Sequence, residues 1–136
     1  MYIFGGDTRD NTTARVSLND LWVYALGTRA WTQVVSVGGS APSPRAGHSL
    51  TPLGNRLVVF GGYDQHVVNM ASSFDSALHC FDLQRQRWRC LAVGGEQSRA
   101  CSDHAAIPCG GGFLIFGGRG SGGERFNDTF LLRVWP

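Results

Sequence analysis

The string RLVVFGGYD at residues 56–64 decides the fold of this chain, because close copies of it occur twice more. The copies are YIFGGD at residues 2–7 and FLIFGGRG at residues 113–120. Successive FGG triplets begin 56 residues apart, at Phe4, Phe60 and Phe116. A fixed period of this length is typical of repeat architectures, so the chain is best understood as a series of similar units.

Residues outside the triplets follow the same period. The matching pairs, 56 or 57 residues apart, are His48 with His104 and Trp31 with Trp88. The segment at 19–31 also matches the segment at 76–88 position for position, and a third copy begins at residue 127. The repeat is therefore carried by glycine, histidine and aromatic positions together.

One unit of the repeat predicts four short strands. We expect them at residues 46–53, 56–62, 77–83 and 88–93, with a tight Gly-Asn turn between the first two. The apolar runs at 57–60 and 113–116 are unbroken, which is typical of strands that are covered on both faces. Helical periodicity is weak throughout, and the sequence predicts an all-β fold.

Composition limits the possible functions. The chain has 136 residues, 43% of them hydrophobic, and a formal net charge of +2. This charge is too small to indicate a nucleic-acid or anionic-membrane surface, and no apolar stretch reaches the ~18–20 residues that a membrane helix needs. The N-terminus has no cationic segment followed by an apolar one, as a secretory signal would. We therefore expect a cytoplasmic protein that binds neither nucleic acid nor membrane.

On these residues the chain resembles the kelch repeat family. The resemblance rests on the FGG triplets, the histidine strand before them, the aromatic third strand and the spaced tryptophan, and it extends over essentially all 136 residues. It implies that each unit of about 50 residues forms one four-stranded antiparallel blade of a β-propeller. The positions that it makes structural are Gly5, Gly6, Trp31, His48, Gly61, Gly62, Trp88, His104, Gly117 and Gly118.

The paired glycines have two possible roles. A phosphate-binding loop would need a following helix whose N-terminus faces the phosphate, whereas loop-forming Asp, Thr, Asn and Gly residues follow here. In the kelch family such glycines end the second strand, where backbones crowd together. The strand-end role is favoured, and no cofactor is expected.

The phase of the repeat divides the chain into three parts. The resemblance implies a partial blade with strands two to four at 1–42, a complete blade at 43–95, and a partial blade with strands one to three at 96–136. Propellers close with about four to eight blades. We therefore expect this region to be completed by further blades of a longer chain, or else by self-association.

Chain direction reverses at every strand, so the connections from second to third strands emerge on one face. They are long, at residues 7–19, 63–76 and 119–127, and they differ in length and composition. Long loops on a rigid scaffold often carry recognition residues, although tolerated drift in solvent loops would give the same variation. The residues expected to contact a protein partner are Arg9, Arg15, Arg45, Tyr63, His66, Arg119 and Arg125.

Kelch-type propellers often act as protein-binding modules, and the resemblance implies this function here, without catalysis. The alternative is part of a propeller enzyme whose active site is completed by blades outside this chain. The four cysteines and four histidines show no CxxC or HxxxH spacing, so a metal site is not expected.

Two positions depart from the repeat. Arg45, three residues before His48, fits the family's PRxxH pattern, but the equivalent residue of the next unit is Cys101. Asp103 likewise stands where the previous unit has Gly47. The inner strand of the third blade is therefore the least regular part of the pattern.

Overall fold

The computed structural model describes residues 1–67, 69, 73–91 and 99–134, and its ten named elements are all β-strands. The first sheet contains β1 (Tyr2–Arg9), β2 (Arg15–Ala25) and β3 (Ala30–Gln33). The second contains β4 (Ala46–Leu53), β5 (Arg56–Tyr63), β6 (Leu78–Asp82) and β7 (Arg87–Leu91). The third contains β8 (Ala105–Cys109), β9 (Gly112–Phe116) and β10 (Thr129–Arg133). Paired strands are antiparallel in every sheet, which confirms the predicted all-β fold.

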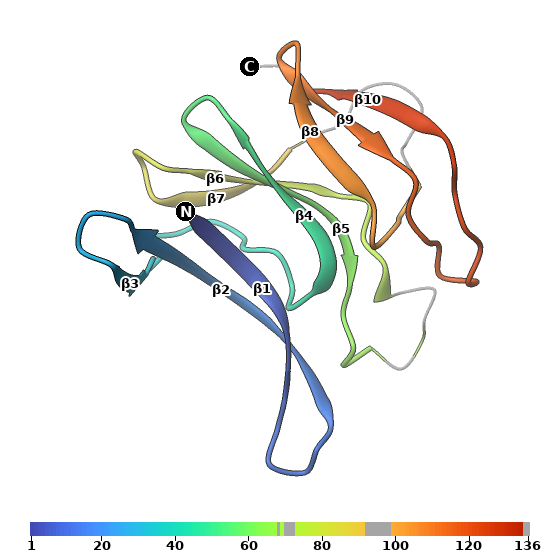
Figure 1. Cartoon of the computed structure of the whole chain (residues 1–136), viewed down its shortest axis with the longest axis horizontal. Helices are drawn as coiled ribbons and strands as arrows, with labels where there is room; N and C mark the ends of the chain where they lie inside the picture. Colours follow the sequence, from blue (N-terminus) through green and yellow to red (C-terminus); the bar gives the residue numbers. More distant parts are fainter. Residues whose placement is uncertain (68, 70–72, 92–98, 135–136) are drawn as a thin grey trace.

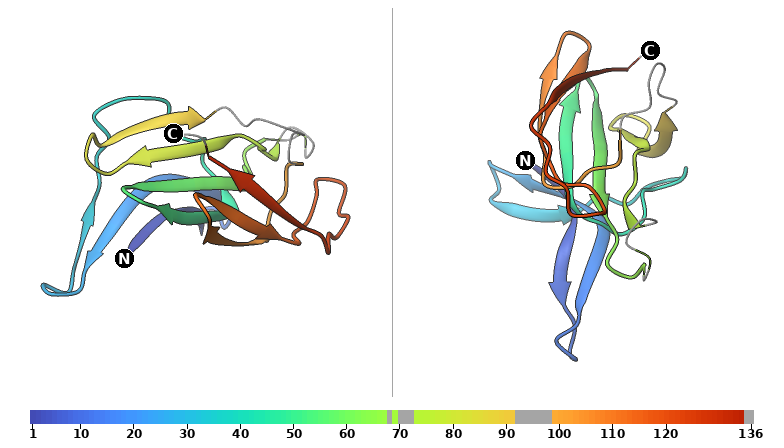
Figure 2. Two further views of the ribbon diagram at one scale, coloured as in Figure 1. Left: turned by 90° about the horizontal axis from the view of Figure 1, so that it is seen from above. Right: turned by 90° about the vertical axis from the view of Figure 1, so that its right-hand side faces the viewer.

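The three sheets lie side by side and fan out from their inner strands (Figure 1). β4 contacts both β1 and β8, so the second sheet lies between the other two. Figure 2 shows the same three sheets in two further views. Hydrophobic side chains fill the two spaces between neighbouring sheets, and these two clusters form the core.

β5 supplies both clusters, because its side chains alternate between its two faces. Leu57 and Val59 belong to the cluster that contains Phe4 of the first sheet. Val58 and Phe60 belong to the cluster shared with the third sheet. All four side chains are buried, so β5 is covered on both faces, as its unbroken apolar run predicts.

β9 differs from this expectation. Phe113 and Ile115 are fully buried, but Phe116 is 54% exposed and Leu114 is half-buried. Among the described residues, no further sheet packs on the side of β9 that faces away from the second sheet. The prediction of two covered faces for this strand is therefore wrong.

The paired glycines join neighbouring sheets through backbone hydrogen bonds. Gly62 N donates to Cys101 O at 2.9 Å, and Gly6 N donates to Arg45 O at 2.9 Å. Gly61 adopts a φ of +68°, and a Cβ atom at this position would lie 2.3 Å from Cys101 O. Glycine is thus required where two backbones approach closely, which is the strand-end role expected of these residues.

The two repeated histidines occupy equivalent places between sheets. The His48 ring meets Phe4 edge-on, with centroids 5.4 Å apart, and the His104 ring meets Phe60 in the same way at 5.3 Å. His104 Nε2 also forms a hydrogen bond with Ser49 Oγ at 2.9 Å. Burial lowers the pKa of His48 to about 4 and also lowers the pKa of His104. Both imidazoles are therefore neutral packing groups near neutral pH.

The first long connection is a hairpin rather than the expected loop. Pairing of β1 with β2 continues to Arg9 and Arg15, so most of the segment at 7–19 is strand. Asp10 closes the turn by accepting hydrogen bonds from two backbone N–H groups that follow it. The hairpin projects beyond the body of the molecule (Figure 1).

The four strands predicted for the central unit correspond to β4, β5, β6 and β7. The predicted end of the last strand, at 92–93, and the blade boundary at 95 lie outside the described residues. The division of the chain at residues 42 and 95 stays a prediction.

Candidate functional site

Three connections emerge on one side of the molecule: β1–β2, β5–β6 and β9–β10 (Figure 1). We call this side the long-loop face. The short turns between the other paired strands lie on the far side (Figure 1). The residues expected to contact a partner were placed on the long-loop face, and the structure brings three of them together.

A pocket of about 290 Å³ opens on the long-loop face and is lined by these three residues. Arg15 comes from the first sheet, Tyr63 from the end of β5, and Arg119 from the connection after β9. The other lining residues are Asp64, Gln65 and Val67. Two sheets and the β9–β10 connection therefore contribute to one site.

Arg119 is held in place by its backbone and by its guanidinium. Its backbone exchanges two hydrogen bonds with Ser102, at 2.8 and 2.9 Å. Its guanidinium lies over the Tyr63 ring, with Cζ 5.6 Å from the ring centre. Its buried Nε has no hydrogen-bond partner in the described part of the chain, and pairs with Asp103 Oδ2 only at 3.5 Å. Tyr63 in turn stacks on Phe74, with centroids 5.7 Å apart.

Arg15 reaches the pocket from the β1–β2 hairpin. Its Nη1 lies 3.5 Å from Asp7 Oδ2, and 58% of its side chain is exposed. Gln65 ties this hairpin to the second sheet, because its backbone N donates to Ser17 Oγ at 3.2 Å. Exposed ion pairs contribute little stability, so Arg15 can exchange Asp7 for a group on a partner at small cost.

Three further expected contacts lie on the long-loop face but outside the pocket. Arg9, His66 and Arg125 are all exposed. His66 N donates to Asp64 Oδ1 at 2.9 Å, and Arg125 forms a backbone bridge with Arg119. None of the three lines the pocket.

Arg45 is a structural residue, and the expectation that it contacts a partner is wrong for this chain. It is 2% exposed, and its guanidinium donates to Ser43 O at 3.1 Å, Gly61 O at 3.0 Å and Asp75 Oδ2 at 2.9 Å. Asp75 Oδ2 also shares a hydrogen bond with His79 Nε2 at 3.1 Å. The hydrogen bond with His79 is the main reason that the pKa of Asp75 lies well below its ordinary value. Hydrogen bonds from the Ala77 backbone and from Arg45 lower it further, whereas burial acts in the opposite direction. Arg45 therefore ties the glycine strand end to the β5–β6 connection.

Replacing Arg45 with alanine should lower the free energy of unfolding. Removing one partner of a buried charge pair costs ~3–5 kcal/mol, and because the Asp75 side chain is 33% exposed we expect about 2 kcal/mol. Urea denaturation measures the change, with the exposed Arg9→Ala as the control that stays within about 0.5 kcal/mol of the unmodified protein. Equal midpoints for the two variants would show that Arg45 does not stabilise the blade.

Sequence reasoning did not find the remaining groups of the site. Asp64 and Gln65 directly follow the FGGY string, so their place at a strand end on the long-loop face was a usable signal. Asp75 gave no such signal, because its bond with Arg45 joins residues that are 30 apart in the sequence. Only the fold of the β5–β6 connection brings these two together.

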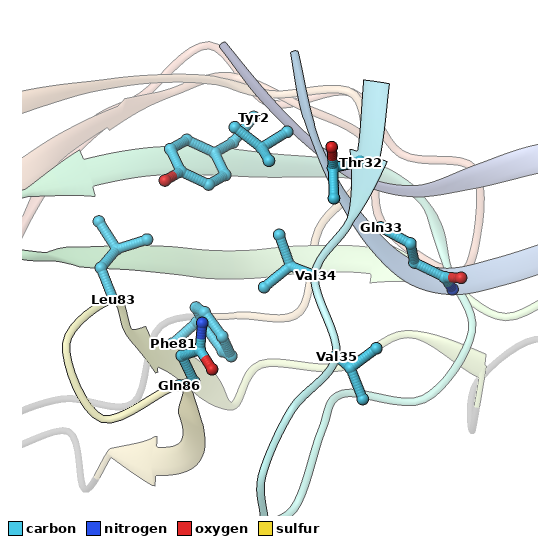
Figure 3. A pocket seen from close by; sticks show the side chains of 9 residues that line it. Tyr2, Thr32, Gln33, Val34, Val35, Phe81, Leu83 and Gln86 are labelled. Atoms are coloured by element: carbon cyan, nitrogen blue, oxygen red, sulfur yellow. The ribbon is translucent and has the colours of Figure 1, made fainter. Parts of the chain in front are cut away.

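A second cleft, of about 360 Å³, lies between the first two sheets. Figure 3 shows Tyr2, Val34, Phe81 and Leu83 around it. Its lining residues are apolar or uncharged. The cleft offers no charged group that could orient a ligand, and we assign no site to it.

Metal, thiol and membrane features can be stated for the described residues. Across 1–67, 69, 73–91 and 99–134, no three His, Cys, Asp or Glu side chains are grouped as a metal ion would need. The four cysteines are free thiols, and burial raises the pKa of Cys101 to about 11, which keeps this thiol protonated. The same part of the chain holds no helix with the length and apolar character needed to cross a bilayer.

Antiparallel sheets that stack face to face around their inner strands, with glycine pairs at the ends of the second strands, define part of a β-propeller. The long-loop pocket, built by two sheets and the β9–β10 connection, is a typical place for a binding site on such a scaffold. The chain belongs to the kelch repeat family, because residues 1–134 match the model of the KLHDC2/KLHL20/DRC7 Kelch-repeats domain. The resemblance seen in the sequence is thereby confirmed.

Curated relatives match most of this chain. The chain is 34% identical over 119 residues to Tip elongation aberrant protein 1 of Schizosaccharomyces pombe, covering 88% of this chain and 10% of that protein. It is 30% identical over 140 residues to Kelch domain-containing protein 3 of Bos taurus, covering 98% of this chain and 34% of that protein. It is 32% identical over 110 residues to Ras guanine nucleotide exchange factor F of Dictyostelium discoideum, covering 80% of this chain and 9% of that protein.

The solved structure of YjhT shares the fold, with a TM-score of 0.78 and 22% sequence identity. The match covers 99% of this chain and 45% of the YjhT chain. This chain thus spans between about a tenth and a third of the curated relatives named above, and less than half of YjhT.

Proposed function

We propose that this kelch region is a non-catalytic protein–protein interaction module of the cytoplasm that holds its partner on the long-loop face. One observation carries the proposal: Arg15 of β2, Tyr63 of β5 and Arg119 of the β9–β10 connection line one pocket. Guanidinium groups bind carboxylate and carbonyl oxygens, and a tyrosine ring supplies apolar contact area with a polar tip. Such anchors on rigid strands can recognise a protein segment without reorganising the scaffold.

The relatives support a binding role. The matched region occurs in proteins whose names describe different activities, a Ras guanine nucleotide exchange factor and a Rho GTPase-activating protein, both of Dictyostelium discoideum. A module that recurs beside different activities is better suited to recognition than to one fixed reaction. The alternative of a propeller enzyme completed by other blades has no observation in its favour among the described residues.

Binding should depend on the long-loop face and not on the short turns. The immobilised chain is used to capture a protein from cell lysate, which is identified, purified and titrated calorimetrically against variants. Arg15→Ala with Arg119→Ala should weaken the complex about 30-fold or more, since losing one anchor at an interface centre costs about 2 kcal/mol. The matched control is Arg85→Ala with Arg87→Ala, two exposed arginines at the β6–β7 turn.

The control pair should leave the affinity unchanged, and both double variants should keep the unfolding midpoint of the unmodified protein. Loss of binding in the short-turn variant alone would place the partner on the opposite face. Equal affinities for all three proteins would remove the pocket from the interface.

A further inference from the structure

Cys90 is an exposed thiol on the outermost strand of the second sheet. In the antiparallel ladder of β6 and β7 it is directly opposite His79. Directly opposite residues point to the same face of a sheet, with Cβ atoms about 4.5–5.5 Å apart. Phe81 and Trp88, the pair two positions further along, both pack between the first and second sheets. The thiol and the imidazole therefore lie together on the side of the second sheet that faces the first sheet.

Asp75 fixes the orientation and the tautomer of His79. Asp75 Oδ2 lies 3.1 Å from His79 Nε2. The pKa of Asp75 lies well below its ordinary value, chiefly because of this hydrogen bond, so near neutral pH the carboxylate is ionised and can only accept. His79 Nε2 must therefore carry the proton of the hydrogen bond. In the neutral imidazole the other nitrogen, Nδ1, is then an unprotonated acceptor.

His79 Nδ1 is a buried acceptor that lacks a donor. It has no hydrogen-bond partner in the described part of the chain, and the His79 side chain is only 11% exposed. A buried polar atom without a partner costs free energy, so its presence in a folded protein requires a reason. The Cys90 thiol is an S–H donor. Because it is exposed, rotation about its Cα–Cβ bond can turn the sulfur towards the face that His79 occupies.

A carboxylate, an imidazole and a thiol in this order are the groups that activate a cysteine nucleophile. The imidazole accepts the thiol proton, the carboxylate stabilises the imidazolium that forms, and the contact between thiol and base is often long without a bound ligand. Cys101 shows the contrast. Its Sγ lies 3.4 Å from His104 Nδ1, but Cys101 is 1% exposed, and His104 Nε2 is bonded to the Ser49 hydroxyl instead of a carboxylate. Access and the carboxylate therefore distinguish Cys90.

We propose that Cys90 is a modification site, at which His79 and Asp75 promote exchange of the thiol with small-molecule disulfides. Cys90 Sγ attacks one sulfur of the disulfide, so that a new S–S bond forms and the S–S bond of the small molecule breaks. The Cys90 proton passes to His79 Nδ1 and then to the leaving thiolate, which departs as a thiol. The disulfide is the only oxidant needed, and excess thiol reverses the reaction. None of these three residues lines the long-loop pocket, so the modification site is separate from the proposed partner site.

Oxidised glutathione is the probe that tests the proposal. The folded chain is incubated with it and quenched with acid, and the adduct on each cysteine is quantified by mass spectrometry of peptides. Cys90 should form its mixed disulfide about tenfold faster than Cys109 or more, since a positioned base contributes ~10²–10⁴-fold to a rate. Cys109 is the matched control within the same molecule, because it is also exposed but its partner in the ladder is Gly112.

Two further measurements assign the effect to His79 and to the fold. His79→Gln should reduce the rate at Cys90 to that at Cys109 and leave the rate at Cys109 unchanged, with circular dichroism to check that the variant is folded. In denaturant, where the ladder is lost, the two cysteines of the unmodified protein should react at equal rates. This comparison needs no variant, so it tests the proposal even if His79→Gln does not fold.

Three results would overturn the proposal. Equal rates at the two cysteines of the folded protein would show that Cys90 is not activated. A fast Cys90 in the folded His79→Gln variant would mean that exposure alone accounts for the reaction. A preference for Cys90 that persists in denaturant would place its cause in the local sequence and not in the pairing with His79.

Discussion

Gly61→Ala is expected to lower the free energy of unfolding by about 3 kcal/mol, of which about 1–2 arise from the backbone and the rest from crowding. Gly61 has a φ of +68°, in the region that favours glycine. Its new Cβ would lie 2.3 Å from Cys101 O and 2.8 Å from His104 Cε1. Cys101 O cannot retreat without breaking the hydrogen bond from Gly62 that joins the second and third sheets. Denaturant unfolding measures the loss.

Gly54→Ala is the matched control for this prediction. Gly54 also has a positive φ, +57°, but nothing lies within 4 Å of its would-be Cβ. This variant should lose only the backbone cost of about 1–2 kcal/mol. If the two variants unfold at the same denaturant concentration, close approach of the sheets does not explain the glycine pair.

Trp88→Ala is expected to lower the free energy of unfolding by about 3–5 kcal/mol, the usual cost of removing a buried aromatic side chain. Trp88 is 4% exposed and packs on both Phe4 and Phe81, so its loss opens a cavity between the first two sheets. The melting temperature and the denaturant midpoint should both fall. The first sheet should lose contact with the second before the rest of the protein unfolds.

Trp31→Ala tests the same repeat position without a covering sheet. Trp31 is 45% exposed, so its removal should cost about 1 kcal/mol or less. Both tryptophan variants are compared with the unmodified protein in the same denaturant series. If both variants lose the same free energy of unfolding, burial between the first two sheets does not explain the contribution of Trp88.

The candidate site was only partly predictable from the sequence. Arg15, Tyr63 and Arg119 were predicted as contacts because they lie in connections that share one face, and they do meet in one pocket. Arg45 was predicted on similar grounds. Its guanidinium, however, donates hydrogen bonds to Gly61 O, Asp75 Oδ2 and Ser43 O within the protein. The PRxxH pattern around Arg45 does not say whether its side chain is exposed, and only its tertiary contacts decide this.

The sequence by itself determined the strands, their turns and the repeat. A period of 56 residues, apolar runs and glycine pairs are local features, and local sterics and side-chain alternation convert them into antiparallel sheets. Phe4, Phe60 and Phe116 have the same local pattern, because each begins an FGG triplet after an apolar run. Only the tertiary structure decided that the first two are buried and the third is 54% exposed, because burial depends on whether another sheet lies opposite. The same physical reason leaves Trp31 exposed where Trp88 is buried.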